Sequence, residues 1–243
     1  MPQSIAPLDK VRHAKLTLTR SDDFSFAADL NMAPLLPVEI AEASLYYPIV
    51  FLPRNQGSLV PHALFGLEKA NHYLDKGKHW TVPYIPLYVL NYPFSLAKGI
   101  GEQGEERFAL AIDESASQFK HKKGMPLFTK EGEFSELTTR ANTTLAQQHK
   151  QYDLTLVAMT EVDATGILEE QSIAVRSGSV THKVQGLRVI NREKLMALPD
   201  ATLVRWTRNG ILEILFAHLN SLHLLSNLTR HLPVKGEPNA TVQ

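Results

Sequence analysis

The sequence of 243 residues contains no cysteine. Disulfide bonds, thiolate zinc sites and cysteine nucleophiles are therefore excluded. An excess of charge is missing as well, because 25 Lys and Arg residues balance 25 Asp and Glu residues. Proteins that bind nucleic acid normally carry a basic excess or a basic face, so nucleic acid is not expected to be a partner.

Long apolar runs are also lacking. A membrane span needs roughly 18 consecutive apolar residues, whereas the longest apolar stretches, residues 45–52 and 211–228, are too short or are interrupted by polar residues. Residues 1–13 show no apolar run after a basic start, which a secretory signal would need. These absences predict a cytoplasmic protein with no transmembrane segment.

The common catalytic and cofactor motifs do not occur: there is no GxSxG, HExxH, P-loop or EF-hand loop. Residues 99–104 have the spacing GxGxxG, but a dinucleotide site needs a strand before the glycines and a helix after them. Here a helix is expected before them and a strand after them, so no cofactor is predicted. His72 and His79 lie near Asp75 with no further ligand at a telling spacing, so no metal site is predicted either.

Aromatic side chains are abundant in one stretch, residues 79–94. Trp80, Tyr84, Tyr88 and Tyr92 recur at every fourth position, which is close to the period of an α-helix. On such a helix the four rings would drift slowly around one side. The stretch is therefore the first candidate for a functional surface.

Proline residues limit this helix. Proline is tolerated only in the first turn of a helix, so a short helix is predicted over about residues 84–91. It begins near Pro83 or Pro86 and ends before Pro93, and Trp80 lies outside it.

Three roles are open for Tyr84, Tyr88 and Tyr92. The rings can pack in the core while their hydroxyls reach the surface. They can line a pocket or groove for a planar, sugar-like or peptide ligand. They can also anchor a protein partner, since tyrosine is common in such interfaces.

Periodicity predicts one α+β domain over residues 1–243, with its core at about 11–230 and a polar tail at 233–243. An antiparallel sheet of about five or six strands would pack against a long C-terminal helix. The predicted strands are residues 11–20, 45–52, 59–67, 107–113, 172–175, 180–184 and 187–190. The predicted helices are residues 134–150, 152–166 and 211–231, of which the last is the longest.

Three polar residues are candidates for catalysis. His218 and Ser221 are three positions apart on one helix face, and an acid such as Asp113 could orient them as a nucleophilic site. Alternatively, His218 donates to a loop carbonyl beneath its helix and fixes the packing. Asp113 follows an apolar strand, so it either lines a pocket or forms a turn.

The order of several motifs along the chain resembles that of the SapC family, over about residues 11–230. The most specific motif is YIPLY at residues 84–88, which runs into YPF at residues 92–94. One departure is that Leu90 and Asn91 stand where typical members carry two arginines, so a basic contact is not expected there. The other matching segments are residues 47–51, 111–113, 126–128 with Gly132, 186–187, 193–195 and 217–222.

The resemblance implies a function without a catalytic residue set. The family is named for a surface-layer-associated protein, and members occur near TonB-dependent receptors and flavin-dependent halogenase-like proteins. It implies a non-catalytic cytoplasmic accessory protein of a bacterial surface-layer, secretion or nutrient-uptake system. A small ligand or protein partner would bind at Tyr84, Tyr88 and Tyr92. The alternative is an unrecognised enzyme acting on an amino acid or sugar through His218, Ser221 or Asp113.

Overall fold

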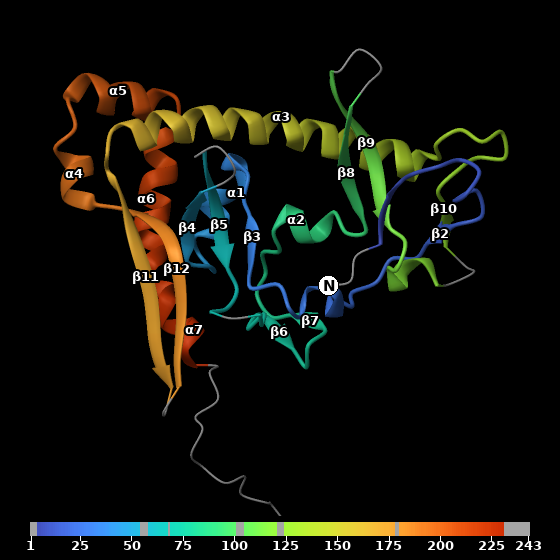
Figure 1. Ribbon diagram of the computed structural model, residues 1–243, viewed down its shortest axis with the longest axis horizontal. Helices are drawn as coiled ribbons and strands as arrows, with labels where there is room; N and C mark the ends of the chain where they lie inside the picture. The colour runs from blue at the N-terminus through green and yellow to red at the C-terminus, as the bar shows by residue number, and fades with distance from the viewer. Residues whose placement is uncertain are drawn as a thin grey trace, which may run out of the picture.

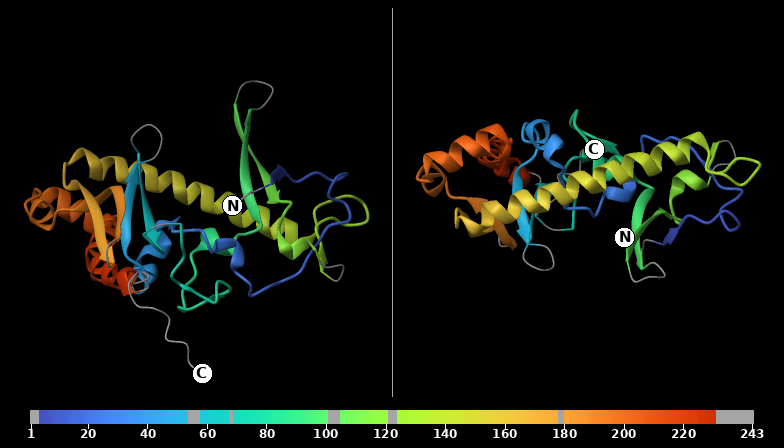
Figure 2. Two further views of the ribbon diagram at one scale, coloured as in Figure 1. Left: turned by 60° about the horizontal axis from the view of Figure 1, so that its bottom comes forward. Right: turned by 90° about the horizontal axis from the view of Figure 1, so that it is seen from above.

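A computed structural model of the chain shows a mixed helix and strand protein built along one long helix (Figure 1). This helix, α3 (Glu136–Ala164), has 29 residues and crosses the length of the molecule (Figure 2). A five-stranded sheet lies at one end of α3 and a three-stranded sheet at the other. The structure describes residues 4–53, 58–67, 69–100, 105–120, 124–177 and 180–230.

Helix α3 replaces the two helices that were predicted over residues 134–150 and 152–166. It contains neither Pro nor Gly, so nothing in its sequence interrupts the hydrogen-bond ladder. The Ser135 side chain caps its first turn by accepting a hydrogen bond from the Thr138 N–H. Gly166 follows its last turn with φ +70°, a conformation that favours glycine. The prediction of two helices was wrong, whereas the predicted end at Gly166 is confirmed.

The five-stranded sheet confirms the predicted antiparallel sheet of about five or six strands, although residues 17–18 and 106–113 pair in other sheets. Its order is β11 (Leu168–Ser177), β12 (Val180–Ile190), β4 (Ile49–Pro53), β5 (Leu59–Leu64) and β3 (Met32–Pro34). Residues 45–52 form a strand only from Ile49 onward. Residues 54–57, between two of the predicted strands, lie outside the described residues.

The three strands predicted within residues 172–190 are a single hairpin, β11 and β12. Gly186 separates two of the predicted strands, but the residue lies inside β12 with φ +73°. The pairing register shifts between Gln171 and Ile173, so Gly186 belongs to a β-bulge. A glycine with positive φ therefore marked an irregularity within a strand and not the end of one.

The C-terminal helix packs on this sheet as predicted but is not continuous. Helix α6 (Ile211–Ser221) contacts β4 and β12, and it continues through a 3-10 turn (Leu222–Leu224) into α7 (Leu225–Arg230). Helix α3, and not this segment, is the longest helix. The predicted polar tail, residues 233–243, lies outside the described residues.

The segment Ile211–Leu228 has the length and mean hydropathy, 1.2, of a membrane-spanning helix, although only a third of it (33 %) is buried. Core helices pass the same criterion. Its inner side packs on the sheet through side chains such as Leu215, which is fully buried. The absence of a transmembrane segment stays a prediction.

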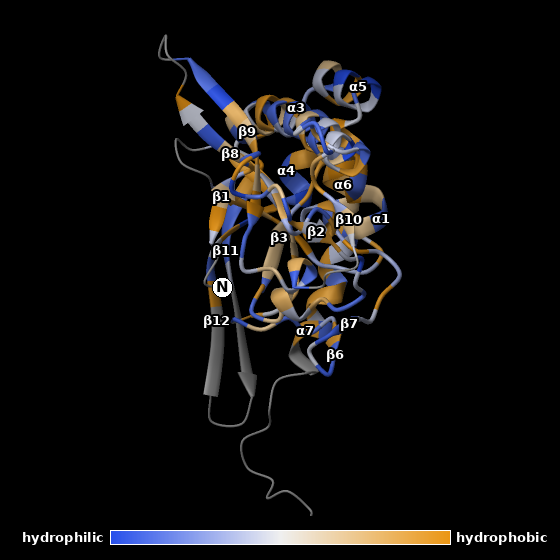
Figure 3. Cartoon of the chain, turned by 90° about the vertical axis from the view of Figure 1, so that its right-hand side faces the viewer, coloured by the Kyte–Doolittle hydropathy of each residue, from blue (hydrophilic) through white to orange (hydrophobic). Residues whose placement is uncertain are grey.

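The three-stranded sheet has the order β1 (Ile5–Pro7), β9 (Glu106–Asp113) and β8 (Phe94–Ile100). A helix was predicted to precede the glycines of residues 99–104, but strand β8 already begins at Phe94. A strand thus precedes the GxGxxG spacing, and another strand, not a helix, follows it. Residues 101–104 lie outside the described residues. Strand β9 is polar at its first residues, toward the hairpin tip, and mostly apolar in its second half (Figure 3).

The remaining elements are short. Residues 11–20 contain a turn and only the two-residue strand β2 (Thr17–Leu18), which pairs with β10 (Met125–Pro126). Helix α1 (Pro37–Ala43) contacts α6 and α3, and helix α2 (Leu87–Leu90) contacts β3. A 3-10 turn spans Ser25–Ala27. The other elements are β6 (Leu74–Asp75), β7 (His79–Trp80), the 3-10 turn Ser117–Phe119, α4 (Arg192–Met196) and α5 (Asp200–Arg208).

Candidate functional site

A groove of about 950 Å³ lies between the two sheets, beside α3 and α2. Its volume is at the upper end of the range of small-molecule sites, about 300–1,000 Å³. One wall comes from the segment after β3 and from α1, and the opposite wall comes from β8 and the end of β9. The groove is lined by Tyr88 and Tyr92 and by Asp113, so the structure brings these three predicted site residues to one surface.

Tyr88 is the most accessible of the three predicted tyrosines. It lies on α2, and 51 % of its surface is exposed at the groove. Helix α2 has only one turn, and its start is fixed from outside by Glu39, whose Oε1 accepts a hydrogen bond of 2.8 Å from the Leu87 N–H. An exposed aromatic ring on an anchored turn is suited to contact a ligand.

Tyr84 does not line the groove, but it binds Glu39, which holds the start of α2. Its hydroxyl donates to Glu39 Oε1 at 2.7 Å, and its carbonyl accepts a hydrogen bond from the Tyr47 hydroxyl. Burial, and next the hydrogen bond to Glu39, raise the pKa of Tyr84 far above its ordinary value. Glu39 is buried and also accepts the Leu36 N–H at 2.9 Å, so one carboxylate joins α1, Tyr84 and α2.

Tyr92 and Asp113 form a hydrogen-bonded pair in the groove. The Tyr92 hydroxyl donates to Asp113 Oδ2 at 3.1 Å, while its ring stacks on Phe26 with 3.9 Å between the ring centroids. Burial, followed by the Asp113 charge, raises the pKa of Tyr92 to about 12. At neutral pH the pair therefore presents a protonated phenol beside a carboxylate.

Asp113 is only 4 % exposed, and its other oxygen is held by neighbouring groups. Oδ1 accepts hydrogen bonds from the Ser115 N–H at 3.0 Å, the Ser115 hydroxyl at 2.6 Å and the Ser4 N–H at 3.2 Å. Burial acts to raise the pKa of Asp113, but the hydrogen bonds, led by those from Ser115, outweigh it and lower this pKa. The residue both forms a turn and lines the groove, the two roles that its position after a strand suggested.

His218 and Ser221 lie elsewhere, in the packing between α6 and the five-stranded sheet. Both are fully buried. His218 Nδ1 donates to the Ile49 carbonyl at 2.8 Å, and Nε2 accepts the Ile190 N–H at 3.1 Å. The Ser221 hydroxyl accepts the Ile49 N–H at 2.9 Å and donates to the His218 carbonyl at 2.7 Å. Because these bonds go to the backbone, the structure does not form the nucleophilic arrangement with Asp113. The carbonyl beneath the helix that accepts from His218 belongs to strand β4 and not to a loop.

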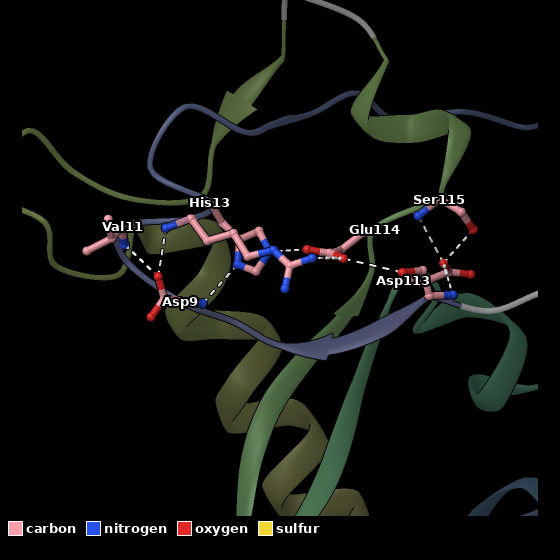
Figure 4. Close-up of polar contacts among 8 residues, drawn as sticks. Asp9, Val11, His13, Asp113, Glu114 and Ser115 are labelled. Atoms are coloured by element: carbon pink, nitrogen blue, oxygen red, sulfur yellow. Dashed lines mark hydrogen bonds and ion pairs between the residues drawn. The ribbon is translucent and has the colours of Figure 1, made fainter.

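A histidine–carboxylate pair that sequence reasoning missed lies behind Asp113 (Figure 4). His13, only 2 % exposed, donates from Nε2 to Glu114 Oε1 at 2.7 Å and accepts the Asp9 N–H at Nδ1. Arg12 binds the other Glu114 oxygen at 2.6 Å. The hydrogen bond from His13, and next the Arg12 charge, lower the pKa of Glu114.

This pair fastens the N-terminal segment to the end of β9. His13 and Glu114 are separated by 101 positions, so no local pattern could reveal the contact. The Ser4 N–H, which binds Asp113, belongs to the same N-terminal segment. The pair therefore acts on the groove indirectly, by holding one of the donors to Asp113 in place.

Within the part of the chain that the structure describes, no three His, Asp or Glu side chains are grouped as metal ligands. The groove offers carboxylates, tyrosine rings and hydroxyls, side-chain amides, a lysine, a histidine and the backbone of β8. They can bind a ligand by hydrogen bonds, ring contacts and charge.

The fold and groove define an α+β protein with antiparallel sheets and an open cleft between them. The model of the SapC family matches residues 8–228, nearly the whole chain. The chain belongs to the SapC family, as the motifs at residues 84–88 and 92–94 predicted. The comparison with curated proteins gave no match, and the comparison with solved structures gave none.

Proposed function

We propose that this SapC-family protein is a non-catalytic binding protein whose groove takes a small ligand or a segment of a partner protein. Its setting would be a bacterial surface-layer, secretion or TonB-linked nutrient-uptake system, in which it serves as a cytoplasmic accessory protein. Family membership supports the setting. The observation that carries the binding role is the exposed Tyr88 ring beside the Tyr92–Asp113 pair in one groove.

The three predicted tyrosines have different parts in this proposal. Tyr88 and Tyr92 contact the ligand, the first with an exposed ring and the second with the hydroxyl that Asp113 orients. Tyr84 is a positioning residue, because it reaches the site only through Glu39 and the start of α2. The non-catalytic role is supported by His218 and Ser221, whose polar atoms bind backbone groups of the sheet and their own helix.

A second candidate function is supported by Asp113 alone. Its carboxylate and the Tyr92 hydroxyl lie together in the groove, which is the kind of pair that an enzyme acting on an amino acid or sugar could use. In that case Asp113→Asn would abolish turnover while the groove still binds. In the binding protein, the same variant changes affinity and there is no turnover to lose.

Native mass spectrometry of the purified protein, followed by a thermal-shift screen of small molecules, tests the binding role. Tyr88→Ala should lose the bound molecule or the thermal shift and keep the fold. Leu90→Ala is the matched control, because Leu90 lies on the same helix, is 52 % exposed and does not line this groove. If folded Tyr88→Ala binds every ligand as well as Leu90→Ala does, Tyr88 is not part of a site.

A further inference from the structure

One wall of the groove is the outer edge of strand β8. In the order β1-β9-β8, strand β9 is central and β1 pairs with its other side. Within the described part of the chain, no strand pairs with the outer edge of β8. Ser95, Leu96 and Lys98 of this strand line the groove, so the open edge faces the site.

The hydrogen bonds around β9 show which backbone groups of β8 face outward. The Leu110 carbonyl and the Glu114 N–H bond to Leu8 and Ser4, on the side of β1, whereas the Asp113 N–H bonds to the Pro93 carbonyl, on the side of β8. Even-numbered residues of β9 therefore turn their backbone groups toward β1 and odd-numbered residues toward β8.

Strand β8 follows the same alternation. Its register pairs Ser95 with Ala111 and Ala97 with Ala109. Because hydrogen-bonded positions alternate in an antiparallel ladder, Ser95 and Ala97 bond to β9, and Leu96 and Lys98 direct their N–H and carbonyl groups to the open edge. An exposed row of such groups is a template for another strand.

The opposite wall offers a poorer template. Strand β3 is the edge of the five-stranded sheet and ends at Pro34, which also lines the groove (Figure 1). Proline has no N–H to donate, and it commonly protects edge strands from pairing. An added strand would therefore pair with β8 and present one set of side chains across the groove.

Charge indicates which side chains would suit the groove. Glu39, Glu106, Asp113 and Asp153 line it, and its described basic lining residues are Lys98 and His149. Lys98 already forms an ion pair with Glu106. Glu39 and Asp113 are buried and hydrogen-bonded, whereas Asp153, 3.8 Å from His149 Nε2, has 60 % of its side chain exposed. Asp153 is therefore the carboxylate that favours a Lys or Arg side chain, which gains both charge attraction and contact with the tyrosine rings.

We infer that the groove binds an extended peptide segment that pairs with the open edge of β8 and places a Lys or Arg side chain near Asp153 and Tyr88. The inference rests on the proposed binding function and specifies its partner. Backbone pairing supplies affinity in this mode of recognition, and side chains at alternate positions supply specificity. A segment of about six residues, spanning about 20 Å, matches the length of β8.

The test uses a fluorescently labelled decapeptide of alternating Lys and Val, with affinity measured by anisotropy on the full chain. Two comparison peptides are needed, one with Glu in place of Lys and one with methylated backbone nitrogens. The Lys–Val peptide should bind at least tenfold more tightly than either. Equal binding of the methylated peptide would overturn edge pairing, and equal binding of the Glu peptide would overturn the charge argument.

Two matched charge-reversal variants test whether the peptide contacts Asp153. Asp153→Lys should weaken binding of the Lys–Val peptide at least tenfold, whereas Asp163→Lys, with the same charge change on an exposed part of α3 outside the groove, should leave it unchanged. Equal effects of the two variants would show general charge attraction and contradict the inference.

A probe without a peptide backbone separates this inference from the proposed function. If benzyltrimethylammonium stabilises the wild type but not Tyr88→Ala, and the peptide does not bind, the groove is a small-molecule site and the peptide inference is wrong. If neither probe binds and Tyr88→Ala retains whatever the native protein carries, the proposed function fails as well.

Discussion

His218 lies between α6 and the five-stranded sheet with no exposed surface, whereas Asp113 lies at the end of β9 on the wall of the groove. His218 makes two hydrogen bonds, both to backbone groups of strands β4 and β12. Asp113 accepts four hydrogen bonds, one of them from the Tyr92 hydroxyl. The first residue is committed to packing, and the second adjoins a space that a ligand can enter. The number of hydrogen bonds therefore does not distinguish a structural from a functional polar residue. What distinguishes them is whether a ligand can enter the space beside the residue.

The largest expected loss of stability comes from replacing the buried residue His218. His218→Ala leaves the Ile190 N–H and the Ile49 carbonyl without partners in a dry environment and opens a cavity. The free energy of unfolding should fall by about 4 kcal/mol. Urea unfolding measures it, and His223→Ala, at an exposed position just after α6, should change it by less than about 0.5 kcal/mol. A loss below about 1 kcal/mol for His218→Ala would mean that the site is not enclosed.

Lowering the pH should destabilise the protein through His218. Burial lowers the pKa of His218 from 6.5 to about 4, although the hydrogen bond to Ile49 acts the other way. The unfolded chain therefore takes up a proton first as the pH falls, and stability is lost between about pH 6.5 and pH 4, by about 3 kcal/mol. The contribution of Asp113, whose folded pKa is lowered, is instead present above pH 3.8 and lost below it.

Nuclear magnetic resonance distinguishes His218 from an exposed histidine. Its ring signals should not titrate between pH 7 and pH 5, whereas those of an exposed histidine should. Urea midpoints at pH 7 and pH 4.5 give the accompanying loss of stability. A His218 signal that titrates near pH 6.5 would contradict the prediction.

Removing Asp113 should cost less, although it has more hydrogen bonds than His218. Asp113→Ala is expected to lower the free energy of unfolding by about 2 kcal/mol, because water in the groove can reach some of the groups left behind. The matched control is Asp153→Ala, in the same groove with 60 % of its side chain exposed, which should have almost no effect. If Asp113→Ala were as damaging as His218→Ala, the two environments would not differ as described.

Tyr92→Phe should have the smallest effect. It removes one hydrogen bond to an ionised carboxylate and keeps the ring stacked on Phe26, so stability should fall by about 1 kcal/mol. Thermal unfolding in the absence and presence of a groove ligand gives both stability and affinity. A larger loss of affinity than of stability would assign the hydroxyl to the ligand; a loss of stability alone would assign it to packing.

Local patterns predicted the elements whose determinants are close in sequence. The strand that begins at Leu59 and the glycine after α3 both depend on a few adjacent residues. Family membership could be recognised for a related reason, since the motif at residues 84–88 is contiguous. The short helix over residues 84–91 was placed correctly because proline geometry is a local constraint, although its helical part is only Leu87–Leu90.

Contacts between distant segments could not be predicted. Tyr84 has the same spacing as Tyr88 and Tyr92, but its role is set by Glu39, 45 positions earlier. His13 and Glu114 gave no signal because each is an ordinary polar residue in its own stretch. The groove itself is formed by segments from β1 to α3, and no single one of them has the composition of a binding site.

Helix α3 packs on β5 at one end of the molecule and on β8 toward the other. A helix of 29 residues is about 44 Å long and resists stretching, because its rise of 1.5 Å per residue is fixed by backbone geometry. The distance between the two sheets is therefore set by the number of residues in one helix. Inserting one residue between the contact points would move the sheets apart by about 1.5 Å and rotate them by about 100°. The number of residues in α3 thus sets the width of the groove. Substitutions along the helix should preserve this width, whereas an insertion or deletion should change it.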